Sequence, residues 1–259
     1  MKLSVNHSQA LISGLTAGSL HVDAIEWVPA LPPQAIREAR EILPEMPFHF
    51  HQGRMRFDQP GYQALREYIQ LCPQSPWVSI HLAPLPALIT IPALRWKLFL
   101  PQPSPTGSIR RFIQQVKKLQ LRFKRPVILE NMPALHPRKY RFESEPETIW
   151  QVQEATGCKL LLDLAHARIA AEARRMDVHA YIKALPLEHV VQMHLAGTRR
   201  DERSGRLYDA HQPLSREDYE LLDWTLARAA PEWITLEYFR EDPAALSDQL
   251  QRLAALIQA

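Results

Sequence analysis

The chain has 259 residues, 46% of them hydrophobic and 23% charged, which is ordinary globular composition and enough material for one large core. Its formal net charge of +3 comes from basic residues scattered among nearly as many acids, so charge alone does not indicate nucleic-acid binding. The two cysteines, Cys72 and Cys158, lie far apart and exclude both a disulfide framework and a thiolate zinc site.

Short runs of aliphatic and β-branched residues recur along the chain, and stretches with helical periodicity follow most of them. Several runs are apolar without alternation, as expected of parallel strands that are buried on both faces. The 22 prolines, against only 8 glycines, mark boundaries between these segments. The eight runs predicted as strands are residues 2–6, 24–28, 47–51, 78–81, 127–131, 160–164, 190–194 and 234–238.

Stretches with helical spacing lie between the predicted strands. Ser215 begins one of them and has Asp218 three residues on, an arrangement typical of a helix N-cap. The predicted helices are residues 33–42, 61–71, 108–122, 145–156, 178–185, 215–229 and 243–257. Eight strand and helix units in about 250 residues are the usual size of a (β/α)₈ TIM barrel, so we predict one such domain over residues 1–259.

Residues 84–107 interrupt this pattern, because they contain six prolines and are too long for a simple connection from strand to helix. The segment follows the C-terminal end of a predicted strand. We therefore expect either a lid over the barrel mouth or a helical insertion packed on the rim.

Polar residues occur in the apolar runs almost always at their C-terminal ends. In a TIM barrel these ends point to one face, where the active sites of this fold are built. Two further pairs lie just beyond strands, in the segments DLAH and DAH. The candidate metal ligands are His51, His81, Glu130, Asp163, His166, His194, Asp209, His211 and Glu237. His49 lies two residues before His51 on the same side of its strand, so we expect it to support the site.

Histidine, aspartate and glutamate without a competing cysteine form a donor set that suits zinc, iron or manganese. One ion needs only three or four protein ligands, so nine candidates predict two or three ions, bridged by Glu130 or Glu237. Cations would also remove the repulsion among clustered buried carboxylates. A lone histidine at a strand end is more often a packing residue, and Asp163 can equally cap a helix, but the joint pattern favours a metal site.

Several segments carry a family resemblance. VILENMP, KLLLDLAHARIAA, VVQMHLAG, YDAHQPL and WITLEYF resemble, in order and spacing, the multinuclear non-haem iron-dependent oxidative enzymes, whose barrel is xylose-isomerase-like. The resemblance implies that the candidate ligands above hold metal, and that either Asp163 or His166 is the ligand supplied at the end of the sixth predicted strand. It further implies that Asn131, which follows Glu130 as in the family's ENP motif, orients a ligand.

The same resemblance implies an iron-dependent oxidase or oxygenase that modifies a peptide, often at cysteine. A small molecule is the other substrate class, and a small recognition protein is an expected partner. Arg199 or Arg200, just after HLAG, can pair with substrate carboxylates. The chain has no visible signal peptide and no long apolar stretch, so we expect a soluble cytoplasmic protein without membrane contact.

Three other functions remain open at this point. His166, three residues after Asp163, resembles the DxxH of endonuclease IV-type zinc enzymes and favours phosphodiester hydrolysis, although the weak basic bias makes nucleic acid an unexpected partner. A sugar isomerase or epimerase would need only two carboxylates and one divalent ion. The third is a catalytically inactive scaffold. It would be favoured if inert residues filled several of the nine ligand positions, but all nine hold histidine, aspartate or glutamate.

Overall fold

The computed structural model describes the chain except for residues 29, 54–56, 82–103, 135–141 and 259. The predicted lid or insertion at 84–107 therefore lies almost wholly outside the described residues. Only its last four residues are described, and they form the N-cap and first turn of helix α5 (Pro105–Phe123).

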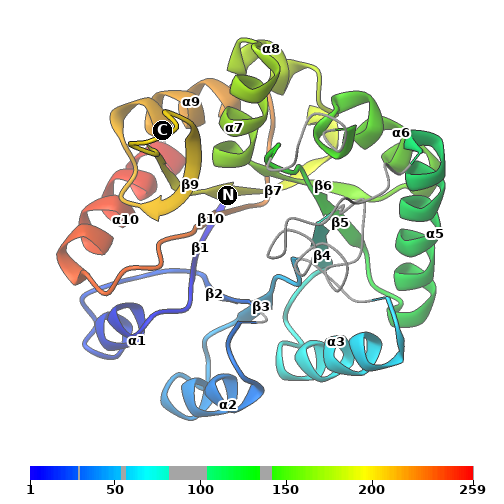
Figure 1. The fold of residues 1–259 in the computed structure, drawn as a ribbon. Helices are drawn as coiled ribbons and strands as arrows, with labels where there is room; N and C mark the ends of the chain where they lie inside the picture. The colour runs from blue at the N-terminus through cyan, green and yellow to red at the C-terminus, as the bar shows by residue number, and fades with distance from the viewer. Residues whose placement is uncertain (29, 54–56, 82–103, 135–141, 259) are drawn as a thin grey trace.

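Eight parallel strands form one sheet in the order β3-β2-β1-β10-β7-β6-β5-β4. They are β1 (Lys2–Asn6), β2 (Ala24–Trp27), β3 (Phe48–Phe50), β4 (Val78–His81), β5 (Val127–Glu130), β6 (Lys159–Asp163), β7 (Val190–Leu195) and β10 (Trp233–Leu236). A parallel bridge between His51 and Ser79 joins the two ends of this order, so the sheet closes on itself. Figure 1 shows the resulting ring of strands inside a ring of helices, which confirms the predicted (β/α)₈ barrel.

Helices cover the outside of the barrel. Besides α5 they are α1 (Gln9–Thr16), α2 (Pro33–Ile42), α3 (Gln59–Leu71), α6 (Pro146–Thr156), α7 (Leu164–Arg174), α8 (Val178–Lys183), α9 (Arg216–Leu226) and α10 (Pro243–Gln258). Ser215 caps α9 in a complete capping box with Asp218, as the sequence predicted. None of the helices in the described ranges combines the length and apolar character needed to cross a membrane.

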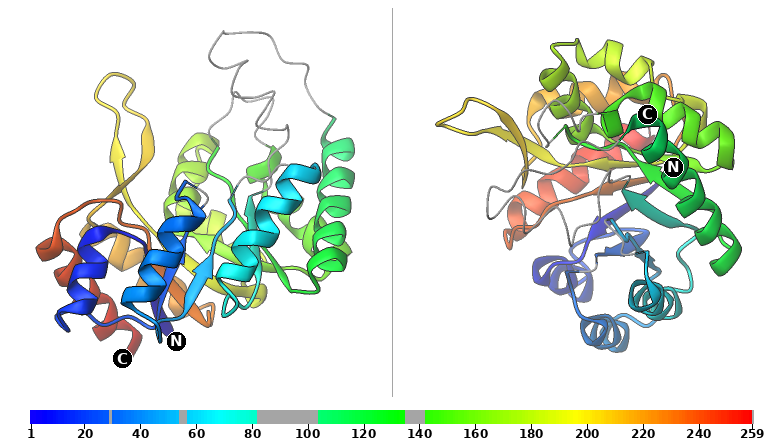
Figure 2. Two further views of the ribbon diagram at one scale, coloured as in Figure 1. Left: turned by 90° about the horizontal axis from the view of Figure 1, so that it is seen from below. Right: turned by 45° about the vertical axis from the view of Figure 1, so that its right-hand side comes forward.

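Two helices and a hairpin were not predicted. Helix α1 is short, and α7 begins directly at the end of β6, where Asp163 caps it by accepting a hydrogen bond from the His166 amide. The antiparallel strands β8 (Gly197–Arg200) and β9 (Leu207–Gln212) form a separate two-stranded sheet. Figure 2 shows this hairpin projecting from the barrel on the side opposite the two termini.

Inward-facing side chains fill the barrel in layers. Alternation along a strand puts Ala24 on the same face as Glu26, and Leu161 on the same face as Asp163. The lowest layer is a small apolar cluster, distinct from the main core, of Ala24, Trp77, Ile128, Leu161 and Trp233. Buried polar residues lie above it, and this apolar floor separates them from the N-terminal end of the barrel.

Candidate metal centre

The nine candidate ligands gather at the C-terminal ends of the strands, together with Glu26. They form five groups of three in which the possible ligand atoms all lie within 4.8 Å of one another. The groups are Glu26, His51 and His194; His51, His81 and Glu130; Glu130, Asp163 and His166; Asp163, His194 and Glu237; and Asp209, His211 and Glu237. Because neighbouring groups share members, the ten residues form one continuous cluster.

Glu130 lies at the centre of one half of the cluster and is 2% exposed. Its Oε2 is 3.1 Å from His51 Nε2 and also contacts His81 Nε2. Its Oε1 is 3.1 Å from His166 Nδ1. One carboxylate therefore faces histidines on both of its oxygens, which is the arrangement of a bridging ligand.

The side-chain amide of Asn131 makes two hydrogen bonds to the backbone of Asp163. Asn131 Nδ2 donates to the Asp163 carbonyl at 2.9 Å, and the Asp163 amide donates to Asn131 Oδ1 at 2.8 Å. The Asp163 Oδ1 caps α7 by accepting from the His166 amide at 2.7 Å, while its Oδ2 has no hydrogen-bond partner. Asp163 is thus both the helix cap and a cluster member, and Asn131 supports it without belonging to any of the five groups.

Glu237, just beyond β10, links the barrel to the hairpin. Its Oε1 is 3.2 Å from His194 Nδ1, and its Oε2 is 3.5 Å from His211 Nδ1. His211 Nε2 is in turn 3.2 Å from Asp209 Oδ2, and that same oxygen is 3.7 Å from His166 Nε2. The hairpin therefore extends over the strand ends and completes the cluster.

An irregularity in the hairpin directs these two side chains. Thr198 pairs with Asp209, but Gly197 pairs with Gln212, so two residues of β9 lie outside the regular ladder. His211 has a φ of 47°, in the left-handed region that a histidine rarely adopts. A Cβ on Gly197 would collide with the carbonyl oxygens of Gln212 and Pro213, so only glycine permits this approach.

Glu26 was missed by the sequence analysis. Its Oε1 is 3.0 Å from His194 Nε2, and the residue is 2% exposed. It lies inside the run AIEW, one residue before β2 ends, whereas the prediction considered only the ends of runs. A carboxylate inside an otherwise apolar strand was the signal that could have revealed it.

His49 does not support the cluster in the way predicted. Its ring packs edge-on against Trp233 with centroids 4.2 Å apart, and its Nδ1 has no hydrogen-bond partner among the described residues. Burial lowers its pKa to about 4, so it is a neutral packing residue deeper in the barrel.

The cluster places carboxylates and histidines close together in a buried site, where burial and neighbouring charges shift their pKa values in opposite directions. Burial raises the pKa of Asp163 to about 7, reinforced by neighbouring carboxylates although His166 opposes the shift. Burial alone would also raise the pKa of Glu26, but neighbouring histidines lower it to about 2. Burial would lower the pKa of His194, yet Glu26 and Glu237 raise it well above its ordinary value. Metal cations would supply the compensating charge to such a group of carboxylates.

The cluster also fits metal ions because some of its buried nitrogen and oxygen atoms lack a hydrogen-bond partner among the described residues. Several buried donor and acceptor atoms have no hydrogen-bond partner within the part of the chain that the structure describes, although buried polar atoms are normally satisfied. Among the nine candidate ligands these atoms are Glu130 Oε2, Asp163 Oδ2, His194 Nδ1 and His211 Nδ1. Nitrogen and oxygen donors of this kind suit zinc, iron or manganese.

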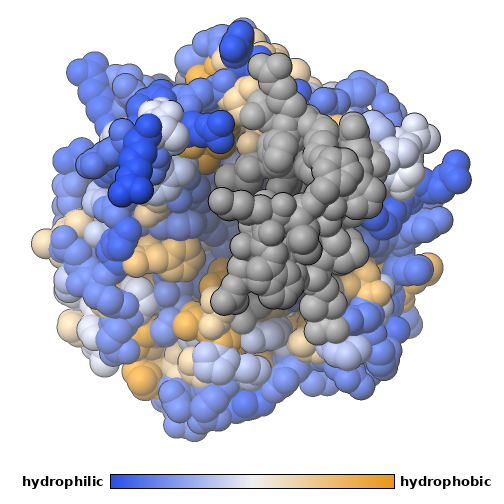
Figure 3. Space-filling model, in the orientation of Figure 1, coloured by the Kyte–Doolittle hydropathy of each residue, from blue (hydrophilic) through white to orange (hydrophobic). Residues whose placement is uncertain are grey.

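Arg199 lies outside the five groups. Its guanidinium donates to the carbonyl of Thr198 at 2.7 Å and of Pro213 at 3.3 Å, and the residue is exposed. Arg200 is also exposed and pairs with Glu172 of α7 at 2.7 Å. Figure 3 shows hydrophilic side chains gathered over this hairpin, at the upper left of the view.

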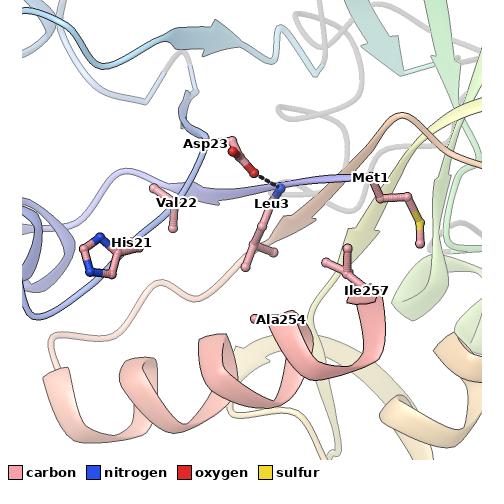
Figure 4. A pocket seen from close by; sticks show the side chains of 7 residues that line it. All are labelled: Met1, Leu3, His21, Val22, Asp23, Ala254 and Ile257. Atoms are coloured by element: carbon pink, nitrogen blue, oxygen red, sulfur yellow. Dashed lines mark hydrogen bonds between the residues drawn. The ribbon is translucent and has the colours of Figure 1, made fainter. Parts of the chain in front are cut away.

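A cavity of about 260 Å³ lies at the other end of the barrel, beside the start of β1. Figure 4 shows its lining, in which Asp23 accepts a hydrogen bond from the Leu3 amide. It is lined by Met1, Leu3, His21, Val22, Asp23, Ala254 and Ile257. None of these residues belongs to the metal cluster, so this cavity is separate from it.

Comparisons with known proteins agree with the motifs. A family model described as "RiPP precursor modification enzyme MbnB/TglH/ChrH" matches residues 27–258. The chain is similar to a UPF0276 protein of Paraburkholderia phytofirmans, 32% identical over 160 residues that cover 60% of this chain and 52% of the relative. A UPF0276 protein of Bordetella bronchiseptica is 33% identical over 161 residues, covering 58% of this chain and 54% of the relative. The chain thus spans about half the length of the curated relatives it matches.

Solved structures support the fold. A putative xylose isomerase from Rhodospirillum rubrum superposes with a TM-score of 0.54 at 14% identity, over 100% of this chain and 99% of that one. A D-psicose 3-epimerase from Clostridium cellulolyticum superposes with a TM-score of 0.59 at 13% identity, over 100% of this chain and 99% of that one. At such identities the likeness concerns the fold alone, and it confirms the predicted xylose-isomerase-like barrel.

Proposed function

This chain belongs to the family of RiPP precursor modification enzymes MbnB/TglH/ChrH, and from that premise we propose that it is a metal-dependent enzyme that oxidatively modifies a peptide. The proposed cofactor is two or three transition-metal ions, with iron first and zinc or manganese as alternatives. The proposed substrate residue is often cysteine, with a small molecule as the other substrate class and a small recognition protein as partner.

One observation carries the proposal: the five overlapping groups of ligand atoms, which share members and contain unpartnered buried donors and acceptors. A single ion would use only three or four of these residues. The proposed ligands are His51, His81, Glu130, Asp163, His166, His194, Asp209, His211 and Glu237.

The residues then have distinct roles. Glu130 would bridge, because each of its oxygens faces a different histidine set. Glu237 would join the barrel's ligands to those of the hairpin, since it contacts both His194 and His211. Asn131 would hold Asp163 in place through the two hydrogen bonds from its side-chain amide to the Asp163 backbone. Bound redox-active ions would supply the Lewis acidity and electron transfer for oxidation.

Substrate binding is assigned to the exposed face of the hairpin. Arg199 would pair with a substrate carboxylate, because among the described residues its guanidinium donates to two backbone carbonyls and the residue is exposed. An Arg199→Ala variant should raise KM for an acidic peptide while the metal content stays unchanged.

Metal analysis of protein purified without oxygen tests the proposal. We expect two or three iron ions per chain by elemental analysis, with Mössbauer signals of high-spin iron, and loss of metal in His194→Ala. His179→Ala, at a half-exposed histidine beside Asp177, is the matched control and should retain the metal. Incubation of the iron-loaded protein with candidate peptides and oxygen should then change the peptide mass, and the absence of bound metal would contradict the proposal.

His166 favours a second candidate, hydrolysis of phosphodiesters. It lies three residues after Asp163, as in the DxxH of endonuclease IV-type zinc enzymes, and it contacts both Glu130 and Asp209. Stoichiometric zinc without iron, together with cleavage of DNA containing an abasic site, would favour this function over the oxidative one.

A further inference from the structure

Beneath the cluster, a layer of buried polar side chains surrounds Gln192 of β7. The Trp77 indole donates to Gln192 Oε1 at 2.9 Å. Gln192 Nε2 lies 2.7 Å from Glu26 Oε2, 2.8 Å from Thr235 Oγ1 and 3.1 Å from His194 Nε2. All of these residues are at most 7% exposed, so water does not compete for their hydrogen bonds.

The direction of each hydrogen bond follows from Trp77, because an indole can only donate. Its bond fixes the oxygen of the Gln192 amide, so Nε2 must face the other three atoms as a donor. An amide nitrogen has two hydrogens, and the two shortest contacts are those to Glu26 and Thr235. His194 Nε2, at 3.1 Å, is the longest of the three contacts, so Glu26 and Thr235 are the acceptors that the two hydrogens of Gln192 serve best.

The chain of hydrogen bonds continues from Gln192 through Thr235, again with a fixed donor and acceptor. Since its hydroxyl accepts from Gln192, its own hydrogen can go to Ser4 Oγ, 2.6 Å away. The Ser4 hydroxyl in turn donates to the Ile234 carbonyl at 3.4 Å. The layer thus has one consistent set of donors and acceptors, in which Glu26 only accepts.

From this we infer that Glu26 is a positioning residue, which accepts the Nε2 proton of His194 and so presents the Nδ1 of that ring to the metal centre. Glu26 Oε2 is already occupied by Gln192, and its Oε1, which has no hydrogen-bond partner among the described residues, lies 3.0 Å from His194 Nε2. The other ring nitrogen, Nδ1, faces Glu237 and has no hydrogen-bond partner. A carboxylate behind a metal-binding histidine fixes both its tautomer and its ring orientation.

The inference rests on the proposed metal-dependent function and deepens it by assigning a ligand atom. The alternative use of the same residues is an ion bound directly by Glu26, His51 and His194 Nε2, which also form a group within 4.8 Å. If Glu26 binds an ion directly, a Glu26 variant should lose that ion. If Glu26 only positions His194, the variant should keep the same number of ions and bind one of them more weakly.

Glu26→Gln tests the inference, because an amide has one oxygen and one NH₂ group and cannot accept two hydrogen bonds on opposite sides. In either orientation a donor would face a donor unless His194 moved its proton to Nδ1, which would remove that nitrogen as a metal ligand. We expect the variant to bind Fe²⁺ about 10- to 100-fold more weakly at one ion, in anaerobic competition with a chelator, with the ion count at saturation unchanged. His49→Gln is the control, because His49 pairs in register with Glu26 and is buried in the same barrel interior; its affinity should equal that of the wild type.

A crystal structure of the iron-loaded wild type gives a second readout that does not depend on the variant folding. The iron anomalous signal should be bonded to His194 Nδ1 and to no oxygen of Glu26. Loss of one ion in Glu26→Gln, iron bonded to Glu26, or an unchanged affinity would each overturn the positioning role. A wild type that binds no metal would overturn the proposed function itself, and the positioning role with it.

Discussion

Glu130 is the residue on which the cluster depends most, because it contacts His51, His81 and His166. Replacing its carboxylate by an amide keeps the size but removes the charge and one acceptor oxygen. We expect Glu130→Gln to lose at least one ion per chain.

Elemental analysis after anaerobic purification measures this loss. Glu145→Gln is the matched control, because Glu145 is half-exposed, lies outside the five groups and pairs with Arg174 at 3.5 Å. An unchanged metal content in Glu130→Gln would remove Glu130 from the ligand set.

The ionisation of single residues predicts how metal affinity depends on pH. In the metal-free protein, burial raises the pKa of Asp163 to about 7, and neighbouring carboxylates hold the pKa of His166 and His194 well above the ordinary value. Each group is protonated below its pKa and must lose that proton to bind metal. Affinity should therefore fall as the pH is lowered through about 7.

Titration of the apo-protein with Zn²⁺ between pH 8 and pH 6 measures this dependence, and buffers of different ionisation enthalpy report the protons released. An affinity that stays constant over this range would mean that these groups are already deprotonated before metal binds.

The cysteines behave as buried apolar residues, as the sequence indicated. Burial raises the pKa of Cys72 to about 12 and that of Cys158 to about 11, and both are at most 1% exposed. Since the thiolate is the reactive form, neither should react with a disulfide reagent at pH 8. Both thiols should react once the protein is unfolded in guanidinium, and rapid labelling of the native protein would contradict their burial.

At the level of elements, the hairpin is the part of the site that depends on a single glycine. Gly197→Ala would force β8 away from β9, because the new Cβ meets backbone carbonyls that cannot rotate away. Asp209 and His211 would then move relative to Glu237. We expect loss of the ion that these residues hold, with the barrel still folded.

Metal content and circular dichroism together measure this effect. Gly107→Ala is the control, since a Cβ there makes only ordinary contacts with Ser104 and the substitution lies in the first turn of α5. Full metal content in Gly197→Ala would mean that the hairpin's ligands are dispensable.

The elements differ in how well the sequence predicts them. The eight barrel strands were predicted because burial on both faces requires apolar runs. Helix α7 was missed because its first residue, Leu164, continues the apolar run of β6. Strands β8 and β9 were missed because most of their residues are polar and they lie outside the barrel sheet, so no hydrophobic pattern marks them.

At the level of the whole molecule, closure of the barrel brings the ligands together. Residues far apart in sequence meet because parallel strands end on one face, which is why the strand-end residues could be predicted. Distances and partners could not, since they depend on ring orientation and on strand register. Glu26 illustrates this limit: its role depends on Gln192 and His194, which lie on the opposite half of the sequence.

The seam at which the barrel closes is also where much of the cluster lies. Among the described residues, the backbones on the two sides of the seam are joined by the His51–Ser79 bridge and by one backbone hydrogen bond, from the His81 amide to the Gly53 carbonyl. Strands β6 and β7, in contrast, share four register pairs. His51 and His81 stand on either side of this seam and both contact Glu130. An ion bound by all three would act as a cross-link that holds the cylinder shut. Backbone amides of His51 and His81 should then exchange hydrogen more slowly when metal is added, with little change at β6 and β7, so metal loading would set the rigidity of the barrel as well as its chemistry.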